Sequence, residues 1–294
     1  MNPGVSHLDK ERLERLLGIG LRALEKYEQG MFRMNAPGAC GGEAICRVSQ
    51  EGECAVGRVA ECFTLMSAVK PYLLLRLLEL QGEAQVAEWV DDVPSALPYY
   101  SLEQLQADGG KPRNAMINSG AMLLASKLPG RTPLEQEELF LDWLRELAPG
   151  AGFATDMACL AGVMRREGDP VNAQLAQALE QSGRVAAADS AYEVYFRMCC
   201  LAGTIRDVAK IGYALAVSSS PCRERVLGTM ARCGLYEGSE RWFTTTGIPA
   251  KSGVSGVLFG VWPDEGCVAA CSPWLEEGGN PIFPQVVLAG VRLG

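Results

Sequence analysis

FTLMSAVKPYLLL (residues 63–75) places Ser67 three positions before Lys70, at the start of an apolar run. On a helix, residues three apart share one face, so the Lys70 amine is expected to lie near the Ser67 hydroxyl. A serine becomes an effective nucleophile when a base removes its proton, and a lysine serves as that base when burial lowers its pKa. A motif this short also arises by chance, in which case Lys70 is a surface residue that opens a core helix.

The composition excludes several classes of protein. The chain has 294 residues, 48% of them hydrophobic, which is enough for a large buried core in one domain or two lobes. Its net charge of -8 is unlike the basic surface of a nucleic-acid binder. No apolar run reaches the roughly 20 residues that a membrane span needs, and the N-terminus has no signal-peptide core. We therefore expect a cytoplasmic protein that binds neither nucleic acid nor membranes.

Histidine and cysteine usage limits the chemistry further. The single histidine, His7, lies close to the N-terminus, which argues against a Ser-His-Asp or Cys-His site and against zinc. The 11 cysteines are irregularly spaced without a C-x-x-C pair, so we expect them to be reduced and mostly buried, with a catalytic thiol as the alternative. We expect no metal or cofactor, and the base of a nucleophilic mechanism is then a lysine, tyrosine or carboxylate.

Hydrophobic periodicity predicts strands near both ends of the chain and helices between them. Helices are expected at 8–28, over most of 67–216, and at 224–238 and 282–294. EAICRVS and CAVGRVA predict a β-hairpin with its turn at 49–53, and AKSGVSGVLFGVWP and GCVAACSPW predict two adjacent strands.

The expected fold class is therefore α/β (α+β), with one antiparallel sheet flanked by helices plus an all-helical lobe. Residues 1–294 form one catalytic domain in this interpretation. Its α/β lobe covers about 20–66 and 217–294, and its helical lobe covers about 67–216. A cleft between two lobes is a common place for a ligand, so we expect the active site there.

PAKSGVSGV (249–257) is the second segment with the composition of a site. Its small residues let a strand edge approach a ligand closely. Lys251 is a candidate catalytic residue, because its positive charge is expected to help keep Lys70 neutral. The alternative is a glycine-rich turn that leads into a core strand.

S-x-x-K followed late in the chain by K-S-G resembles the signature of serine β-lactamases and penicillin-binding proteins. A longer set of matches, in the same order from about residue 60 to 284, is similar to the serine-dependent glutaminase family. The matching segments are FTLMSAVK (63–70), KPRNAMINSGAM (111–122), VYFRMCC (194–200), MARCGLY (230–236), PAKSGVSGV (249–257) and SPWLEEGGNP (272–281). The resemblance implies a β-lactamase-like fold and a homodimer or homotetramer.

The resemblance also implies a role for each matched residue of the catalytic centre. Ser67 is the nucleophile and Lys70 the general base. The backbone N–H groups of Ser67 and Val254 form the oxyanion hole. Tyr195 and Tyr236 are the two candidates for passing a proton to the leaving ammonia.

Two asparagines match residues that bind the substrate in the family. Asn118 and Asn172 are implied to hold the substrate amide and its α-carboxylate. Without the resemblance, Asn118 is a loop or cap residue, and Tyr195 is a core tyrosine with a satisfied hydroxyl. Both interpretations stay open from the sequence.

Several departures from the family pattern gather around substrate recognition. Arg165 falls where the family has the glutamate that binds the substrate amine, and a guanidinium prefers a carboxylate to an ammonium. Glu167 is the alternative ligand for the amine. Met66 replaces a glutamine, Tyr100 replaces an asparagine in the substrate shell, and Pro71 is expected to distort the helix beside the nucleophile.

The sequence therefore predicts an amidohydrolase that works through an acyl-enzyme on a small-molecule amide. The substrate is either L-glutamine or a glutamine-like amide that is modified at its amino end. Two alternatives have other functions: a non-catalytic ligand-binding or partner module with the same fold, and an enzyme that acts on β-lactams.

Overall fold

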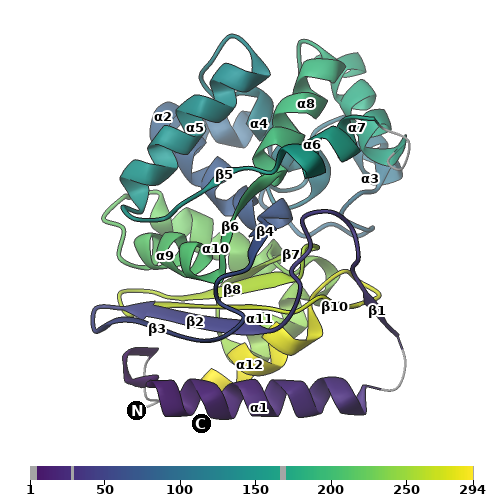
Figure 1. The fold of residues 1–294 in the computed structure, drawn as a ribbon. Coiled ribbons are helices and arrows are strands. Elements are labelled where there is room, and N and C mark those ends of the chain that lie inside the picture. The colour runs from purple at the N-terminus through teal and green to yellow at the C-terminus, as the bar shows by residue number, and fades with distance from the viewer. Residues whose placement is uncertain (1–4, 28–29, 166–169, 294) are drawn as a thin grey trace.

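A five-stranded antiparallel sheet lies beneath a helical half of the molecule (Figure 1). The structure, a computed structural model, describes residues 5–27, 30–165 and 170–293. The strands have the spatial order β3-β2-β9-β8-β7, with bounds β2 (Ala44–Ser49), β3 (Gly52–Gly57), β7 (Ala250–Gly253), β8 (Val257–Trp262) and β9 (Gly266–Cys271). Strands from both ends of the chain pair in one sheet, which confirms the predicted arrangement.

The predicted hairpin is formed by β2 and β3. Its register places Ala44 opposite Gly57 and Ser49 opposite Gly52. Gly52 has a φ of 106°, a left-handed conformation that glycine adopts without steric cost. Every residue of β2, β8 and β9 is buried, so other elements cover both faces of the sheet.

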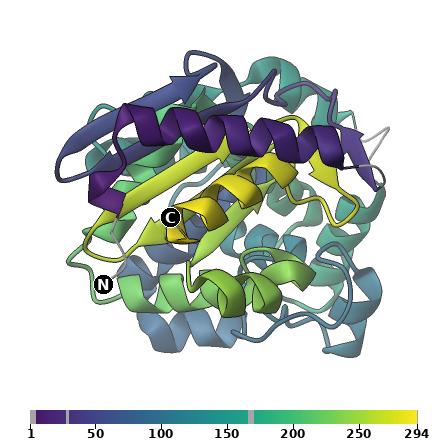
Figure 2. The same ribbon diagram turned by 90° about the horizontal axis from the view of Figure 1, so that it is seen from below.

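Two terminal helices lie side by side on one face of the sheet, α1 (Lys10–Lys26) and α12 (Ile282–Leu293), as Figure 2 shows from below. α1 begins at Asp9, whose side chain accepts a hydrogen bond from the backbone N–H of Arg12. The two helices approach closely at Gly20, where a Cβ would lie 2.5 Å from the Phe283 ring. Both predicted terminal helices are confirmed.

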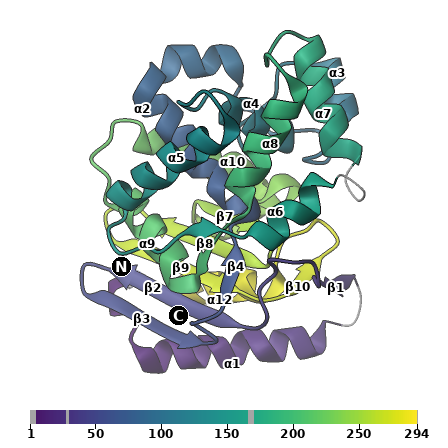
Figure 3. The same cartoon turned by 45° about the horizontal axis from the view of Figure 1, so that its top comes forward.

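The opposite face of the sheet is covered by α9 (Ile205–Ala216). Above α9 and the sheet lies the helical half, which Figure 3 shows turned forward. Its helices are α2 (Lys70–Trp89), α3 (Leu102–Ala107), α4 (Asn118–Ser126), α5 (Pro133–Leu147), α6 (Met157–Met164), α7 (Pro170–Gln181) and α8 (Ala188–Cys199). Tyr72 of α2 stacks on Phe259 of β8 with ring centroids 6.1 Å apart, so the helical half and the sheet share one buried core. The lobe boundaries near residues 66 and 217 stay a prediction.

The remaining elements are short. They are α10 (Arg223–Cys233), α11 (Ser239–Thr246), the 3₁₀ turns Val5–His7, Met66–Val69 and Tyr236–Gly238, and the two-stranded sheet of β1 (Met31–Arg33) and β10 (Trp274–Glu276). Among the described residues, no helix combines the length and apolar character that a membrane crossing requires. The same residues contain no group of three or more His, Cys, Asp or Glu side chains arranged to hold a metal ion.

The helical pattern expected over most of 67–216 is interrupted by two short strands. β5 (Ala154–Thr155) and β6 (Leu201–Thr204) are extended, and with β4 (Cys62–Thr64) they form a three-stranded antiparallel sheet. β6 is only four residues long and lies between two helices, so its period-2 signal is hidden in the helical pattern. Its position matters, because β4 leads directly into the segment that carries Ser67.

The expected strand at 250–263 is in fact two strands, β7 and β8, joined by a turn at residues 254–256. Gly256 has a φ of 105°, and a Cβ there would meet the Ser272 carbonyl oxygen at 2.2 Å. Glycine therefore permits the turn, which the run of small residues hid. The turn places Val254 at the edge of the sheet that faces the helical half.

Candidate active site

Ser67 lies on the 3₁₀ turn Met66–Val69, between β4 and α2. Met66 has a φ of 45°, an unfavourable left-handed conformation for a side chain of its size. The Ser67 carbonyl accepts a hydrogen bond from the Lys70 N–H. Pro71 then falls in the first turn of α2, where a missing N–H costs no helical bond. The residues before Pro71 form this 3₁₀ turn, and Lys70 itself has helical φ and ψ of -58° and -40°.

Lys70 is fully buried. Its Nζ donates hydrogen bonds to the Met116 carbonyl oxygen at 2.9 Å and to Asn118 Oδ1 at 2.8 Å. Burial lowers the pKa of Lys70 from 10.5 to about 7. Two acceptors satisfy both N–H groups of a neutral amine, which leaves its lone pair free to take a proton.

Among the described residues, no hydrogen bond joins Lys70 to the Ser67 hydroxyl. A catalytic hydrogen bond is often long or misaligned without substrate and forms in the complex. The short sequence spacing nevertheless keeps the two residues adjacent, with Ser67 on the 3₁₀ turn and Lys70 at the start of α2.

Lys251 is also fully buried, on β7. Its Nζ donates to the carbonyl oxygens of Gly234 and Ser252, both at 2.8 Å. Burial, and after it the nearby charge of Lys70, lowers the pKa of Lys251 well below its ordinary value. We expected the charge of Lys251 to keep Lys70 neutral, but burial is the main cause for both lysines.

Asn118 is the first residue of α4, and its side chain forms hydrogen bonds with residues of three other helices. Asn118 Oδ1 accepts from Lys70 and also from the Tyr195 hydroxyl of α8, at 3.1 Å. Asn118 Nδ2 donates to Asn172 Oδ1 of α7, at 2.9 Å. Because a lysine amine and a phenol both donate to one side-chain oxygen of Asn118, the orientation of its amide is fixed. Asn118 thereby links Lys70, Tyr195 and Asn172 in one hydrogen-bonded group.

Tyr236 lies between an aromatic ring and a cation. Its ring stacks on Tyr99 with centroids 4.1 Å apart, and Lys251 Nζ lies 4.1 Å from its centroid. Its φ is 55°, so its backbone is strained as at Met66. Burial raises the pKa of Tyr236 far above its usual value. The Ser67 hydroxyl is close enough to lower that pKa slightly, although the geometry falls short of an ordinary hydrogen bond.

The backbone of β7 lies directly against the turn that carries Ser67. A Cβ on Gly253 would come within 2.6 Å of the Leu65 carbonyl oxygen and 3.4 Å of the Ala68 nitrogen. Glycine is thus needed for the close approach, and Val254, the next residue, lines the same pocket as Ser67. Ser67 and Val254, the two residues predicted to form the oxyanion hole, therefore line one pocket.

A pocket of about 290 Å³ opens above Ser67. The structure brings six of the candidate residues to its walls: Ser67, Tyr100, Asn118, Asn172, Tyr195 and Val254. Lys70, Tyr236 and Lys251 are buried next to these residues. Sequence reasoning gave no role to four further lining residues, Tyr99, Val171, Phe196 and Cys199. Phe196 and Cys199 lie inside the matched segment VYFRMCC, so this match is the sequence signal that could have identified them.

Arg165 is not brought to this pocket. It is exposed at the C-terminal end of α6, where its guanidinium lies near Gly162 of its own helix. Glu167 falls outside the described residues. All described residues that line this pocket are neutral. They offer neither a carboxylate to bind a substrate amine nor a guanidinium to bind a substrate carboxylate.

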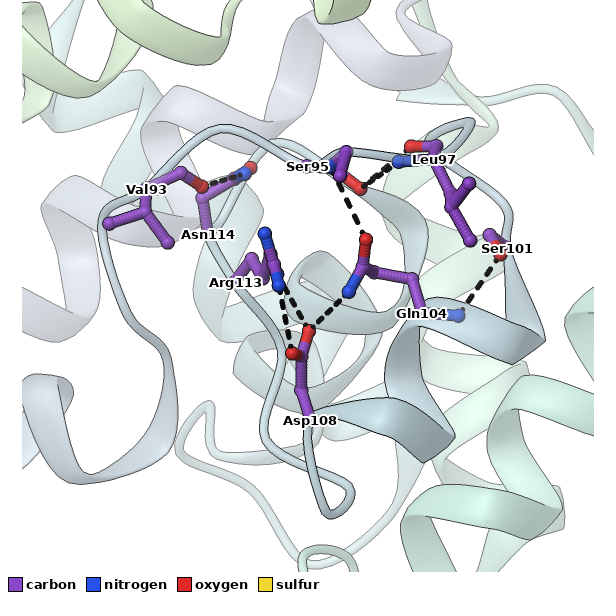
Figure 4. A network of polar contacts seen from close by, with 9 residues as sticks. Val93, Ser95, Leu97, Ser101, Gln104, Asp108, Arg113 and Asn114 are labelled. Atoms are coloured by element: carbon purple, nitrogen blue, oxygen red, sulfur yellow. Dashed lines mark hydrogen bonds and ion pairs between the residues drawn. The ribbon is translucent and has the colours of Figure 1, made fainter.

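A polar network supports the loop that carries Tyr99 and Tyr100 (Figure 4). Asp108 accepts hydrogen bonds from Arg113 at 2.8 Å and from Gln104 at 2.8 Å. The hydrogen bonds from Arg113 lower the pKa of Asp108. The Asn118 N–H in turn donates to the Tyr99 carbonyl oxygen at 2.9 Å, so this loop is tied to the centre of the site.

The comparisons with known proteins agree with this geometry. A sequence model of the family described as Glutaminase matches residues 36–291. A glutaminase from Synechocystis sp. is 42% identical over 232 residues, 77% of this chain and 70% of that protein. A glutaminase from Rhodopseudomonas palustris is 31% identical over 269 residues, 86% of each chain.

Solved structures give the same result for the fold. The probable glutaminase ybaS superposes with a TM-score of 0.85 at 25% identity, over 97% of both chains. A Bacillus glutaminase determined in 4.3 M NaCl gives 0.84 at 25% identity, over 95% of this chain and 96% of that one. The predicted β-lactamase-like α/β fold is therefore confirmed. By its sequence over residues 36–291 and by its fold, the chain belongs to the glutaminase family.

Proposed function

We propose that the protein hydrolyses the side-chain amide of L-glutamine through an acyl-enzyme on Ser67, with Lys70 as general base. As a member of the glutaminase family, the chain is an enzyme that acts on an amide. The observation that carries the finer proposal is the state of Lys70. It is fully buried, its pKa is lowered to about 7 and both amine N–H groups have acceptors, so it is a base near neutral pH.

In the acylation step, Lys70 Nζ takes the proton of the Ser67 hydroxyl as Oγ bonds to the amide carbon. The carbonyl oxygen becomes an oxyanion, which the N–H groups of Ser67 and Val254 stabilise. The C–N bond then breaks, the nitrogen receives one proton and ammonia leaves. In the second step, Lys70 deprotonates a water molecule that attacks the ester, and carboxylic acid and Ser67 are released.

Of the two tyrosines, Tyr236 is the better candidate to protonate the leaving nitrogen. Tyr236 Oη makes no hydrogen bond of ordinary geometry with the described residues and lies near Ser67. The Tyr195 hydroxyl already donates to Asn118. The raised pKa of Tyr236 keeps its phenol protonated, and Lys70 can return the proton it took from Ser67.

The pocket also supports a second candidate, a glutamine-like amide that is modified at its amino end. Asn118 and Asn172 supply neutral hydrogen-bonding groups, and the described lining has no carboxylate to pair with an ammonium. A substrate with a blocked or absent α-amine suits such a wall. Arg165 does not line this pocket, so the proposal rests on the residues that do.

A covalent trap tests the mechanism. A diazo-ketone or phosphonate analogue of glutamine is expected to add one equivalent to Ser67, located by peptide mass spectrometry, and the Ser67→Ala variant is the matched control. An adduct on another residue, or none, contradicts the acyl-enzyme. Such a result, with Ser67→Ala still supporting the protein's cellular role, favours the non-catalytic module.

A substrate panel separates the remaining candidates. Ammonia release is measured with glutamine, N-acyl glutamines and α-keto amides at equal concentrations. Preference for the blocked or amine-free amides supports the second candidate, and turnover of nitrocefin instead supports a β-lactam substrate. Sedimentation and cell fractionation test the predicted homodimer or homotetramer and the predicted cytoplasmic location.

A further inference from the structure

Two buried thiols lie next to each other close to the pocket. The Sγ atoms of Cys159 and Cys200 are 3.4 Å apart, and the Cys200 thiol donates to Cys159. Cys159 lies in the first turn of α6, and Cys200 lies between α8 and β6. The backbone holds the two residues together, because the Asp156 N–H donates to the Cys200 carbonyl oxygen at 2.8 Å.

The two thiols differ in character. The hydrogen bond from Cys200 lowers the pKa of Cys159, against the opposing effect of burial. The same hydrogen bond raises the pKa of Cys200, so Cys200 keeps its proton while Cys159 is the thiolate. Cys159 is therefore the better nucleophile of the pair, since the thiolate is the reactive form.

α6, which carries Cys159, is largely exposed. Of its eight residues, only Cys159 and Leu160 are buried, and Met157 is 65% exposed. Cys159 itself keeps 3% of its surface exposed, whereas Cys267 in the central core is fully buried.

We propose that Cys159 and Cys200 form a dithiol modification site that reacts with small disulfides, and that their internal disulfide weakens substrate binding in the adjacent pocket. The Cys159 thiolate attacks one sulfur of the small disulfide, forms a mixed disulfide and releases one thiolate, which takes the Cys200 proton. The Cys200 thiolate then attacks Cys159 Sγ and expels the second sulfur as a thiolate, which takes up from water the proton that Cys159 lost on ionisation. One external disulfide is reduced to two thiols as the protein pair is oxidised.

The link to the pocket follows from chain connectivity. A disulfide bond is about 2.05 Å long, so the two sulfurs must approach by more than about 1 Å. Cys200 directly follows Cys199, which lines the pocket, and Tyr195 lies one turn earlier on α8. A displacement of about 1 Å in an active site can lower the rate by up to about 100-fold. Only part of the displacement of Cys200 is expected to reach Tyr195, so we expect KM to rise by about tenfold.

Peptide mapping tests the bond itself. The protein is incubated with oxidised glutathione, alkylated and digested with trypsin. The expected product joins peptide 146–165 to peptide 198–206 through one disulfide. Cys200→Ser abolishes this product, whereas Cys199→Ser keeps it and so assigns the sulfur. Cys62→Ser, which removes an exposed thiol on β4, leaves it unchanged.

The effect of the disulfide on substrate binding rests on the proposed function, and it is measured separately from the formation of the disulfide. KM for ammonia release rises about tenfold on oxidation, with a smaller change in kcat, and returns on treatment with dithiothreitol. An inactive reduced protein contradicts the proposed function but leaves the peptide map valid. Formation of glutathione adducts without the cross-link overturns the dithiol, and a cross-link with unchanged KM overturns its effect on the pocket. The wild-type map needs no variant, so misfolding of Cys200→Ser does not compromise it.

Discussion

Between pH 6 and pH 8 we expect kcat/KM for amide hydrolysis to rise about tenfold, because Lys70 acts as a base only when it is neutral. Burial lowers the pKa of Lys70 to about 7. About one-tenth of the molecules then carry the neutral amine at pH 6 and about nine-tenths at pH 8. The fall from 10.5 to about 7 corresponds to about 5 kcal/mol by which the site disfavours the ammonium.

Two substitutions separate the base from its surroundings. Lys70→Arg keeps a cation that cannot lose its proton, so we expect activity to fall by about 10²- to 10⁴-fold at every pH. Lys251→Met removes the second lysine. Because burial is the main cause of the low Lys70 pKa, we expect the midpoint of the remaining activity to move by less than about half a pH unit.

The assay is ammonia release at glutamine concentrations below KM, from about pH 5.5 to about pH 9 at constant ionic strength. Samples returned to neutral pH must regain full activity, which excludes unfolding at the extremes. A flat profile, or a midpoint above about pH 9, refutes Lys70 as the base. A midpoint that moves by more than about one pH unit in Lys251→Met refutes burial as the main cause.

Three further predictions concern packing and charge. Gly253→Ala brings a Cβ to 2.6 Å from a backbone oxygen of the nucleophile's turn, so we expect about a 100-fold loss of kcat/KM, whereas Gly278→Ala, in open space, keeps the wild-type value. Glu137→Gln removes the charge of a buried carboxylate from its pair with the part-buried Arg197, which keeps Glu193 as a second partner, and is expected to lower the free energy of unfolding by about 1–3 kcal/mol in urea titrations. Lys70→Met removes a lysine that binds its proton more weakly in the folded protein than in the unfolded chain, so the free energy of unfolding of the wild type rises with pH between about 7 and 10.5. The amount by which the wild type is less stable than Lys70→Met is therefore expected to fall by about 2 kcal/mol from pH 7 to pH 9.

Each of these has a control or a contrary result. Equal losses in Gly253→Ala and Gly278→Ala would mean that the close approach of β7 is unimportant. Asp142→Asn, in the exposed pair with Arg145, controls for the loss of a charge and is expected to cost less than about 1 kcal/mol. A constant stability difference between Lys70→Met and wild type from pH 7 to pH 9 would mean that Lys70 titrates normally.

The sequence predicts those parts of this molecule that depend on local pattern. The helix at 10–26 and the hairpin of β2 and β3 follow from spacing within one segment, and both are confirmed. β6 and the turn at 254–256 escaped prediction, because one is four residues long and the other lies within a run of small residues. Their conformation is set by partners far away in the chain.

The candidate site divides in the same way. The spacing of Ser67 and Lys70 is visible in the sequence, but one of the two acceptors of Lys70 is the backbone carbonyl of Met116, which no residue type reveals. Tyr99 stacks on Tyr236 across 137 positions of sequence, and aromatic packing of that kind has no local signature. For Arg165, a matched position suggested a contact with substrate, whereas its helix directs it into solvent.

The turn that carries Ser67 is held by distant segments as well as by its own backbone hydrogen bonds. The Leu65 N–H donates to the Leu201 carbonyl oxygen at 2.7 Å, and β7 packs against the same turn. Contacts of such long sequence separation form late in folding. A nascent chain whose residues 250–253 have not yet left the ribosome therefore lacks a complete site. The moment at which hydrolysis begins during synthesis would show when β7 packs against the turn.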